Sequence, residues 1–246
     1  MQELSNMDIE ILLLFNSSNS LIADDIVTTL TSALTWIPVY IALIYMFVKK
    51  NKSVLDISTI IIFALLCVFL SGGINDMFIK PSVERLRPLN DINVRHLLHI
   101  ADGVSETQYS FFSSHAANTF SLAIFISLLT RNTVLCISMV AWSLVNCWTR
   151  LYLGVHYPSD IIVGLSWGCL MGVLCFYLYN KTKNWLYSRR VVDLINQNEN
   201  NETIVSEIIR DNGYNNTGYT TKEIIIIPVI LISIVCAVII KAVFMP

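Results

Sequence analysis

Charged side chains are scarce in this sequence. Asp, Glu, Lys and Arg make up 14% of its 246 residues, whereas hydrophobic residues make up 54%. A soluble domain carries roughly 25% charged residues, because its surface must be solvated by water. The basic residues also form no cluster with interleaved aromatic side chains, as a nucleic-acid partner would require. The composition excludes an ordinary soluble domain and predicts an integral membrane protein.

The cysteines lack the spacing of metal ligands or of a disulfide framework. They include no Cys-x-x-Cys pair, and no histidine stands at metal-ligand spacing from them. All six lie inside apolar runs, at Cys67, Cys136, Cys147, Cys169, Cys175 and Cys236. Because unpaired cysteine is among the most often buried residue types, we interpret them as small apolar side chains and predict neither a metal site nor a cofactor.

Long uncharged runs dominate what the sequence does contain. Six of them lie at residues 33–48, 57–75, 116–130, 132–149, 161–180 and 224–240. An α-helix needs ~20 residues to cross a hydrocarbon core of ~30 Å, and the shorter runs can borrow flanking residues. We therefore predict an all-α fold, an integral membrane bundle of about six transmembrane helices.

The N-terminal stretch, residues 8–30, is amphipathic and too polar to span a bilayer. It predicts one or two short helices lying in the membrane interface. The first three residues, Met-Gln-Glu, lack the basic start of a secretory signal, so we expect no cleaved leader.

The C-terminal part divides into two segments. Residues 191–222 are polar and rich in Asn, with hydrophobic residues at helical spacing from about 201 to Gly213 that predict a short cytoplasmic surface helix. We predict a membrane domain at 1–190, this polar segment at 191–222, and a last transmembrane helix within 223–246.

The positions of the basic residues indicate which loops lie on each side of the membrane. They follow the first, third and fifth runs, at Lys49, Lys50, Lys52, Arg131, Lys181, Lys183, Arg189 and Arg190. Loops rich in Lys and Arg face the cytoplasm. The segment 79–114, the turn 150–157 and both chain ends are then expected on the outer side of a bacterial cytoplasmic membrane.

Three fragments suited to phosphate chemistry fall on that outer side. They are Lys80 with Arg87-Pro88, then Ser113-Ser114-His115, then Arg150 with His156 and Asp160. Taken singly, such residues are interface anchors, helix caps or dipole partners. Cations that break the charge rule in external loops are better explained by an anionic ligand. Their coincidence on one face predicts a phosphate site.

The residue types also supply a reaction. Arginine offers a planar fork that matches phosphate, and the first amides of a helix can bind a phosphate oxygen. His156 and Asp160 are four residues apart, on one helix face, so the carboxylate can fix the imidazole tautomer and leave the other nitrogen as a nucleophile. His115 is placed to protonate a departing oxygen. Asp76, one turn before Lys80, is interpreted as a structural ion-pair partner.

These fragments resemble the three-part signature of the type-2 phosphatidic acid phosphatase family, which also includes the vanadium haloperoxidases. The signature reads Lys-x6-Arg-Pro, then Pro-Ser-Gly-His, then Ser-Arg-x5-His-x3-Asp. Every spacing is kept between residues 80 and 160. Phe112, Ser114 and Thr149 replace the family's Pro, Gly and Ser, and Ser114 adds a side chain where the family's backbone approaches phosphate closely.

The resemblance implies a lipid phosphohydrolase of the acid-phosphatase type that works in two steps without a metal ion. His156 would attack phosphorus to form a phosphohistidine, Asp160 would orient it, and His115 would protonate the leaving group. The phosphoryl oxygens would be held by Lys80, Arg87, Ser113, Ser114 and Arg150.

The substrate that the resemblance implies is a lipid phosphomonoester or diphosphate. Undecaprenyl diphosphate is the first candidate, followed by lipid A phosphate, phosphatidylglycerophosphate and phosphatidate. Loop 80–112 and the N-terminal stretch would choose among them. Two alternatives stay open: an anion transporter, which requires charges at the bilayer midplane, and a non-catalytic lipid-phosphate binding protein. The expected partners are the lipid substrate and the membrane, and oligomeric state is left open.

Overall fold

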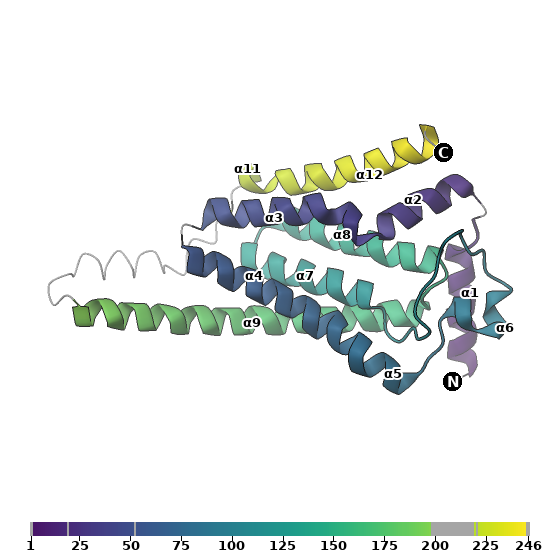
Figure 1. The fold of residues 1–246 in the computed structure, drawn as a ribbon, viewed down its shortest axis with the longest axis horizontal. Coiled ribbons are helices and arrows are strands. Elements are labelled where there is room, and N and C mark those ends of the chain that lie inside the picture. The colour runs from purple at the N-terminus through teal and green to yellow at the C-terminus, as the bar shows by residue number, and fades with distance from the viewer. Residues whose placement is uncertain (1, 19, 52, 198–218, 220, 245–246) are drawn as a thin grey trace.

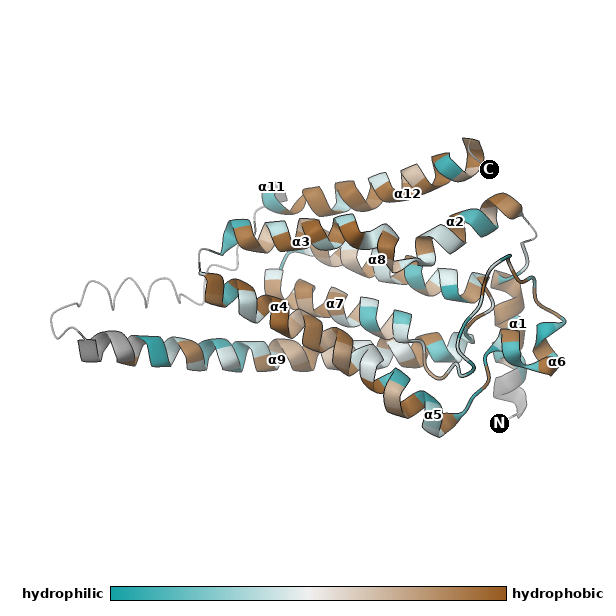
Figure 2. Cartoon of the chain, in the orientation of Figure 1, coloured by the Kyte–Doolittle hydropathy of each residue, from teal (hydrophilic) through white to brown (hydrophobic). Residues whose placement is uncertain are grey.

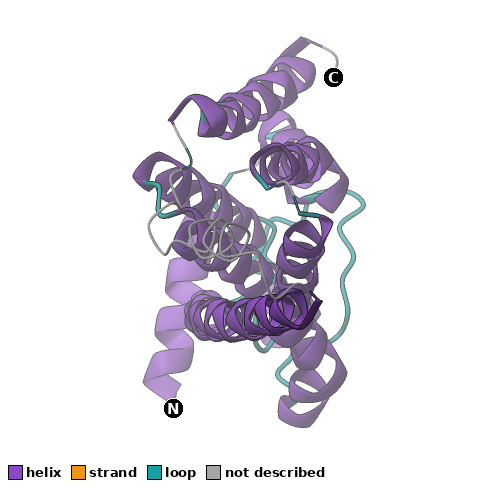
Figure 3. Ribbon diagram, turned by 90° about the vertical axis from the view of Figure 1, so that its left-hand side faces the viewer, coloured by secondary structure: helices purple, strands orange, loops and turns teal. Residues whose placement is uncertain are grey.

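The computed structural model describes residues 2–18, 20–51, 53–197, 219 and 221–244. Within them the regular structure is helical, with one isolated β-bridge between Leu86 and Tyr109 and no strand (Figure 3), which confirms the all-α prediction. The surface helix predicted at about 201–213 lies outside the described residues. The helices, in order, are α1 (Gln2–Phe15), α2 (Leu21–Thr31), η1 (Ala33–Trp36), α3 (Ile37–Lys50), α4 (Val54–Val68), η2 (Phe69–Gly73), η3 (Asn75–Ile79), α5 (Lys80–Val83), η4 (Pro88–Asn90), α6 (Ile92–Arg95), α7 (Ser114–Thr130), α8 (Thr133–Tyr152), α9 (Pro158–Gln197), α11 (Thr221–Ile224) and α12 (Ile226–Phe244).

Five helical stretches are long and apolar enough to cross a membrane. They are Ala33–Lys50, Val54–Val83, Thr133–Tyr152, Pro158–Arg190 and Ile226–Phe244. The remaining predicted span corresponds to α7, which is apolar but has only 17 residues. Figure 2 shows hydrophobic residues along these helices and hydrophilic ones in the loops at the end where α1 and α6 lie. The chain is therefore a multi-pass membrane protein.

The α7 helix is the centre of the bundle. It packs along α9, α8 and α4, and its side chains Ala123 and Phe125 have no exposed surface. Large apolar residues on the surrounding helices are instead exposed, such as Ile62 on α4, Ile162 on α9 and Ile232 on α12. This inversion is expected of a bundle whose outer surface faces lipid.

The two N-terminal helices lie where the amphipathic stretch predicted short helices. In Figure 1, α1 runs across the end of the bundle, while α2 leads into the first span. The α1 helix packs on α8 and α9, and α2 packs on α8 and α12. Their position in the membrane interface stays a prediction.

The three predicted fragments all lie at the end of the bundle that α1 crosses (Figure 1). This end holds α5, α6, the start of α7 and the start of α9. The last turn of α3, with Lys49 and Lys50, and the second half of α9, which holds the basic residues between 181 and 190, lie at the opposite end. The segregation of charge expected from the loops is thus present in the fold.

Candidate active site

Lys80 is positioned by a break in the helical ladder of the second span. After α4 the chain makes two successive π-helical turns, η2 and η3, before α5 begins at Lys80. Such turns widen the helix and occur often at functional sites. The Lys80 Nζ donates to Asp76 Oδ1 at 2.6 Å, which confirms the structural pairing predicted for Asp76.

The serine fragment begins α7 as a helix cap. Ser113 is the N-cap residue and its hydroxyl accepts from the Ala116 N–H at 3.4 Å. The Ser113 N–H donates to the carbonyl of Asp160 at 3.1 Å, which ties the start of α7 to the start of α9. This hydrogen bond occupies one of the amides that the sequence assigned to the phosphate cradle.

The side chain that Ser114 adds to the family pattern is held by the end of the second span. Its hydroxyl donates to Asp76 Oδ1 at 2.7 Å and accepts from the Asn75 amide at 2.9 Å. The same amide donates to the Phe112 carbonyl at 2.6 Å. Asp76 therefore joins Lys80 and Ser114, so two of the predicted phosphate ligands are fixed by one carboxylate.

The two arginines of the signature come together around an acid that the sequence assigned to no role. Arg87 and Arg150 are 3% and 2% exposed. The Glu106 carboxylate pairs with Arg150 through Oε1 and with Arg87 through Oε2, the latter at 3.4 Å. Arg150 also donates to the Thr31 hydroxyl at 2.5 Å, so the end of α2 helps to orient it.

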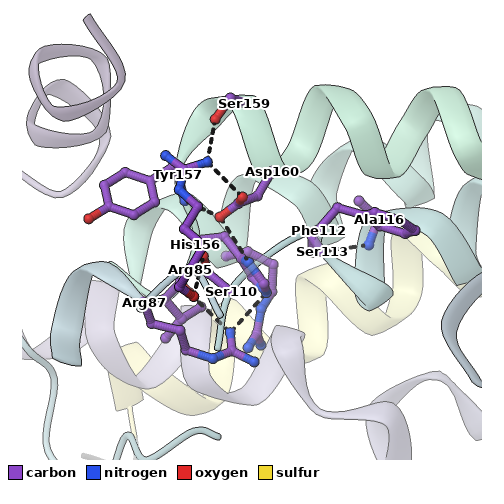
Figure 4. Close-up of polar contacts among 12 residues, drawn as sticks. Arg85, Arg87, Ser110, Phe112, Ser113, Ala116, His156, Tyr157, Ser159 and Asp160 are labelled. Atoms are coloured by element: carbon purple, nitrogen blue, oxygen red, sulfur yellow. Dashed lines mark hydrogen bonds and ion pairs between the residues drawn. The ribbon is translucent and has the colours of Figure 1, made fainter. Parts of the chain in front are cut away.

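His156 lies against Arg87, and this contact fixes its tautomer. An Arg87 N–H donates to His156 Nε2 at 2.9 Å (Figure 4). Because a guanidinium has no acceptor, Nε2 must carry the lone pair, and the ring proton is on Nδ1. Nδ1 faces Asp160 Oδ2 at 3.6 Å, slightly beyond hydrogen-bond distance.

The Asp160 carboxylate is fixed by two other donors. Its Oδ1 accepts from Arg85 at 2.9 Å, and its Oδ2 accepts from the Tyr157 backbone N–H at 3.1 Å (Figure 4). Arg85 also pairs with Asp8 of α1 at 2.8 Å and stacks on the Tyr157 ring at 4.1 Å. The carboxylate expected to orient His156 is thus itself oriented by Arg85, which the sequence analysis missed.

The imidazole of His156 is kept neutral. Burial, followed by the positive charges of Arg87 and Arg150, holds the pKa of His156 well below its usual range. A neutral ring with its lone pair on Nε2 is the form that can act as a nucleophile. The cations around the site therefore favour this neutral form.

His115 belongs to the same cluster. Arg150, Glu106, Lys80 and Arg87 all act on it electrostatically, and His115 acts in turn on His156. Within the described part of the chain its ring makes no hydrogen bond. The structure therefore brings the signature residues to one place, although Asp160 is not yet in hydrogen-bond contact with His156.

Three polar residues from outside the signature complete the site, and the sequence analysis assigned a role to none of them: Arg85, Glu106 and Asp8. Glu106 lies in loop 80–112 and Asp8 in the amphipathic stretch, and neither carries a local sequence signal. Arg85 stands two positions before Arg87, which in the extended segment between α5 and η4 is compatible with a shared face. That alternation was the one available hint.

A cluster of buried cations around two histidines at the end of a membrane bundle is chemically suited to a phosphorylated amphiphile. Comparison with known proteins identifies the family. The family model described as the PAP2 superfamily matches residues 58–184. The chain belongs to this superfamily and is a membrane lipid phosphatase of it.

Curated relatives differ in the lipids they are named for. The lipid A 4'-phosphatase of Bacteroides thetaiotaomicron is 36% identical over 179 residues, covering 72% of this chain and 79% of that protein. That of Porphyromonas gingivalis is 31% identical over 159 residues, covering 62% and 64%. The undecaprenyl-diphosphatase of Sulfolobus acidocaldarius is 30% identical over 139 residues, covering 56% and 61%.

The fold also has a solved counterpart. The transmembrane PAP2 type phosphatidylglycerolphosphate phosphatase of Bacillus subtilis superposes with a TM-score of 0.54 at 21% identity, covering 75% of this chain and 88% of that one. At this identity the likeness bears on the fold alone. The transporter and the non-catalytic binding protein find no support among these relatives, which are phosphatases.

Proposed function

We propose that this phosphatase removes a phosphate monoester from a lipid A-type glycolipid through a phosphohistidine formed on His156. The contact that carries the reaction is the 2.9 Å hydrogen bond from Arg87 to His156 Nε2, because it leaves the lone pair of a neutral ring facing the cation cluster. The choice of lipid rests on the relatives. Two lipid A 4'-phosphatases match more of this chain, at higher identity, than the undecaprenyl-diphosphatase does. We therefore prefer lipid A to undecaprenyl diphosphate, which was the first candidate in the sequence analysis.

In the first step, His156 Nε2 attacks phosphorus in line with the bond to the lipid oxygen. Arg87 turns its N–H from Nε2 to a phosphoryl oxygen, and Arg150 and Lys80 hold the others. The P–O bond breaks and its electron pair stays on the lipid oxygen. His115, which must enter this step as an imidazolium, gives that oxygen the proton that makes it an alcohol. Asp160 faces the Nδ1 proton and stabilises the positive charge that develops on the ring.

In the second step, water replaces the histidine on phosphorus. His115, now without its proton, takes one from the attacking water, and the N–P bond breaks to restore neutral His156. Inorganic phosphate is left among the arginines. No step requires a metal ion, so activity is expected to survive EDTA.

Phosphate release from a panel of detergent-solubilised lipids tests the proposal. The panel contains lipid A with both phosphates, undecaprenyl diphosphate, phosphatidylglycerophosphate and phosphatidate. We expect lipid A to be hydrolysed fastest, and His156→Ala to abolish release. His96→Ala is the matched control, because His96 is an exposed histidine of the loop and should leave the rate unchanged.

Two results would count against the proposal. If undecaprenyl diphosphate is hydrolysed faster than lipid A, the substrate is the one that the sequence analysis put first, and the lipid A proposal is wrong. Turnover that persists in His156→Ala would rule out a phosphohistidine intermediate on this residue.

A further inference from the structure

The loop between α6 and α7 places a negative charge on the predicted phosphate ligands. Glu106 lies in this loop, and its two carboxylate oxygens pair with Arg150 and Arg87. Both guanidiniums are almost fully buried, whereas the Glu106 side chain is 24% exposed. A carboxylate of the protein itself therefore contacts the two cations that a phosphoryl group would need.

Both arginines also have neutral acceptors besides Glu106. Arg87 donates to the Thr107 carbonyl at 2.7 Å and to the Val155 carbonyl at 3.0 Å. Arg150 is held by the Thr31 hydroxyl at 2.5 Å. These neutral acceptors come from three different parts of the chain and would remain in place without the carboxylate. What Glu106 adds to these neutral acceptors is a negative charge shared by both arginines.

The carboxylate is a weaker complement to this cluster than a phosphoryl group. Burial by itself would raise the pKa of Glu106, but Arg150 and Arg87 outweigh it and hold the pKa below its usual range, so the group stays ionised. It offers one charge and two oxygens, against a charge of about −1.5 to −2 and three oxygens for a phosphate monoester. The Nε–H of Arg150 is buried without an acceptor among the described residues. The donors therefore exceed what Glu106 can satisfy.

We propose that Glu106 is a built-in competitor for the phosphate position. It occupies Arg87 and Arg150 in the empty enzyme, leaves when the phosphoryl group of the substrate enters, and returns to displace inorganic phosphate at the end of the cycle. The inference rests on the proposed function, since it assumes that these arginines bind the reacting phosphate. Its benefit is release of a dianion that buried cations would otherwise hold.

Removal of the charge should tighten the binding of phosphate. Glu106→Gln keeps the size of the side chain and one oxygen, but no longer competes as an anion. We expect the inhibition constant for inorganic phosphate to fall on the order of tenfold, the size of a charge-assisted hydrogen bond that is partly exposed. KM for the lipid should fall with it. Because product then leaves more slowly, kcat should also fall.

The experiment compares the purified full-length wild type, Glu106→Gln and Asp102→Asn. Asp102 is an exposed acid of the same loop, so its variant removes the same charge without touching the arginines. Phosphate inhibition, KM and kcat are measured for each. Thermal stabilisation by inorganic phosphate is measured as well, because it reports binding without turnover. Glu106→Ala serves as a second variant in case Glu106→Gln does not fold.

The outcomes separate the inference from the function on which it rests. Tighter phosphate binding in Glu106→Gln or Glu106→Ala, with Asp102→Asn like wild type, supports the competitor. Unchanged or weaker phosphate binding in an enzyme that still hydrolyses lipid overturns it and makes Glu106 a positioning residue for the arginines. Hydrolysis of no lipid by the wild type would defeat the proposed function alone, because the stabilisation experiment would still show whether Glu106 competes with phosphate.

Discussion

Arg85 lies between two carboxylates from distant parts of the chain. It pairs with Asp8 of α1 and with Asp160 of α9, at 2.8 Å and 2.9 Å. Asp8 also accepts from the Ser159 N–H at 2.9 Å, so it caps the first turn of α9. Arg85 touches neither His156 nor the phosphate ligands in the described structure. Its effect on the reaction must pass through the position of Asp160.

Replacement of Arg85 should therefore separate turnover from binding. We expect Arg85→Ala to lower kcat by about a hundredfold, because a misplacement of about 1 Å at a reacting group costs that much, while KM stays close to wild type. Arg85→Lys should recover part of the loss. Arg95→Ala is the control, since Arg95 is exposed on α6. Steady-state kinetics on the preferred lipid provide the measurement, and a rise in KM without loss of kcat would refute this role.

At the level of single residues, the sequence identified the site residues whose spacing follows a known pattern. It missed the residues that reach the site from distant parts of the chain. His156 precedes α9 by two residues and Asp160 lies in its first turn, so the two side chains are close, as the spacing of four predicted, but they do not share a helix face. Glu106 meets Arg150 across 44 positions, and Arg85 meets Asp8 across 77. No periodicity encodes such contacts, because they depend on how helices pack.

Close approach of α7 and α9 brings the two halves of the site together. Three glycines four residues apart, Gly164, Gly168 and Gly172, line α9 where it meets α7. A Cβ at Gly168 would lie 2.5 Å from the Ala117 carbonyl oxygen, and one at Gly164 would lie 2.7 Å from the Ser113 carbonyl oxygen. Small residues allow helix backbones this near each other in a membrane. The contact keeps His115 and His156 at one end of the bundle.

Gly168→Val should force these helices apart. We expect it to destabilise the protein by about 1–3 kcal/mol or more, as overpacking of a tight interface does, and to reduce activity although Gly168 lies outside the site. Val173→Leu adds a methylene to an exposed position of the same helix and should be neutral. Thermal unfolding in detergent checks both variants. Equal stability of Gly168→Val and wild type would show that the interface relaxes without cost.

Helix positions were predictable because lipid imposes a length and an apolar composition. All six predicted runs correspond to continuous helical stretches, of which α7, with 17 residues, is the shortest. The π-helical turns before Lys80 were not predictable, because they depend on packing around Ser71 and Asn75, both fully buried. The length of α9 also exceeds its run at 161–180, since a helix can continue as a polar one after it leaves the apolar layer.

The site is closed on one side by the N-terminal helices. The Asn16 amide donates to the carbonyls of His99 and Tyr152 at 2.8 Å and 2.6 Å, and its oxygen accepts from the His99 N–H. Asp24 pairs with His99 and accepts from the Tyr152 hydroxyl, each at 2.8 Å. The N-terminus, loop 80–112 and the end of α8 thus meet in one polar layer. This layer lies beside the site, and a role of the N-terminal stretch and loop 80–112 in the choice of lipid stays a prediction.

The two ends of the bundle differ in charge, and this difference predicts how the molecule lies in its membrane. The basic residues at the end of α3 and in the second half of α9 favour the cytoplasm, so we predict that the site lies outside. Labelling with a membrane-impermeant maleimide tests this in intact spheroplasts. Asp102→Cys, in the exposed loop at the site end, should react at once, whereas Asn51→Cys, after α3, should react only once the membrane is opened. The unaltered protein controls for its own six cysteines, all within helices. Labelling of Asn51→Cys alone in sealed spheroplasts would invert the orientation and place phosphate release in the cytoplasm.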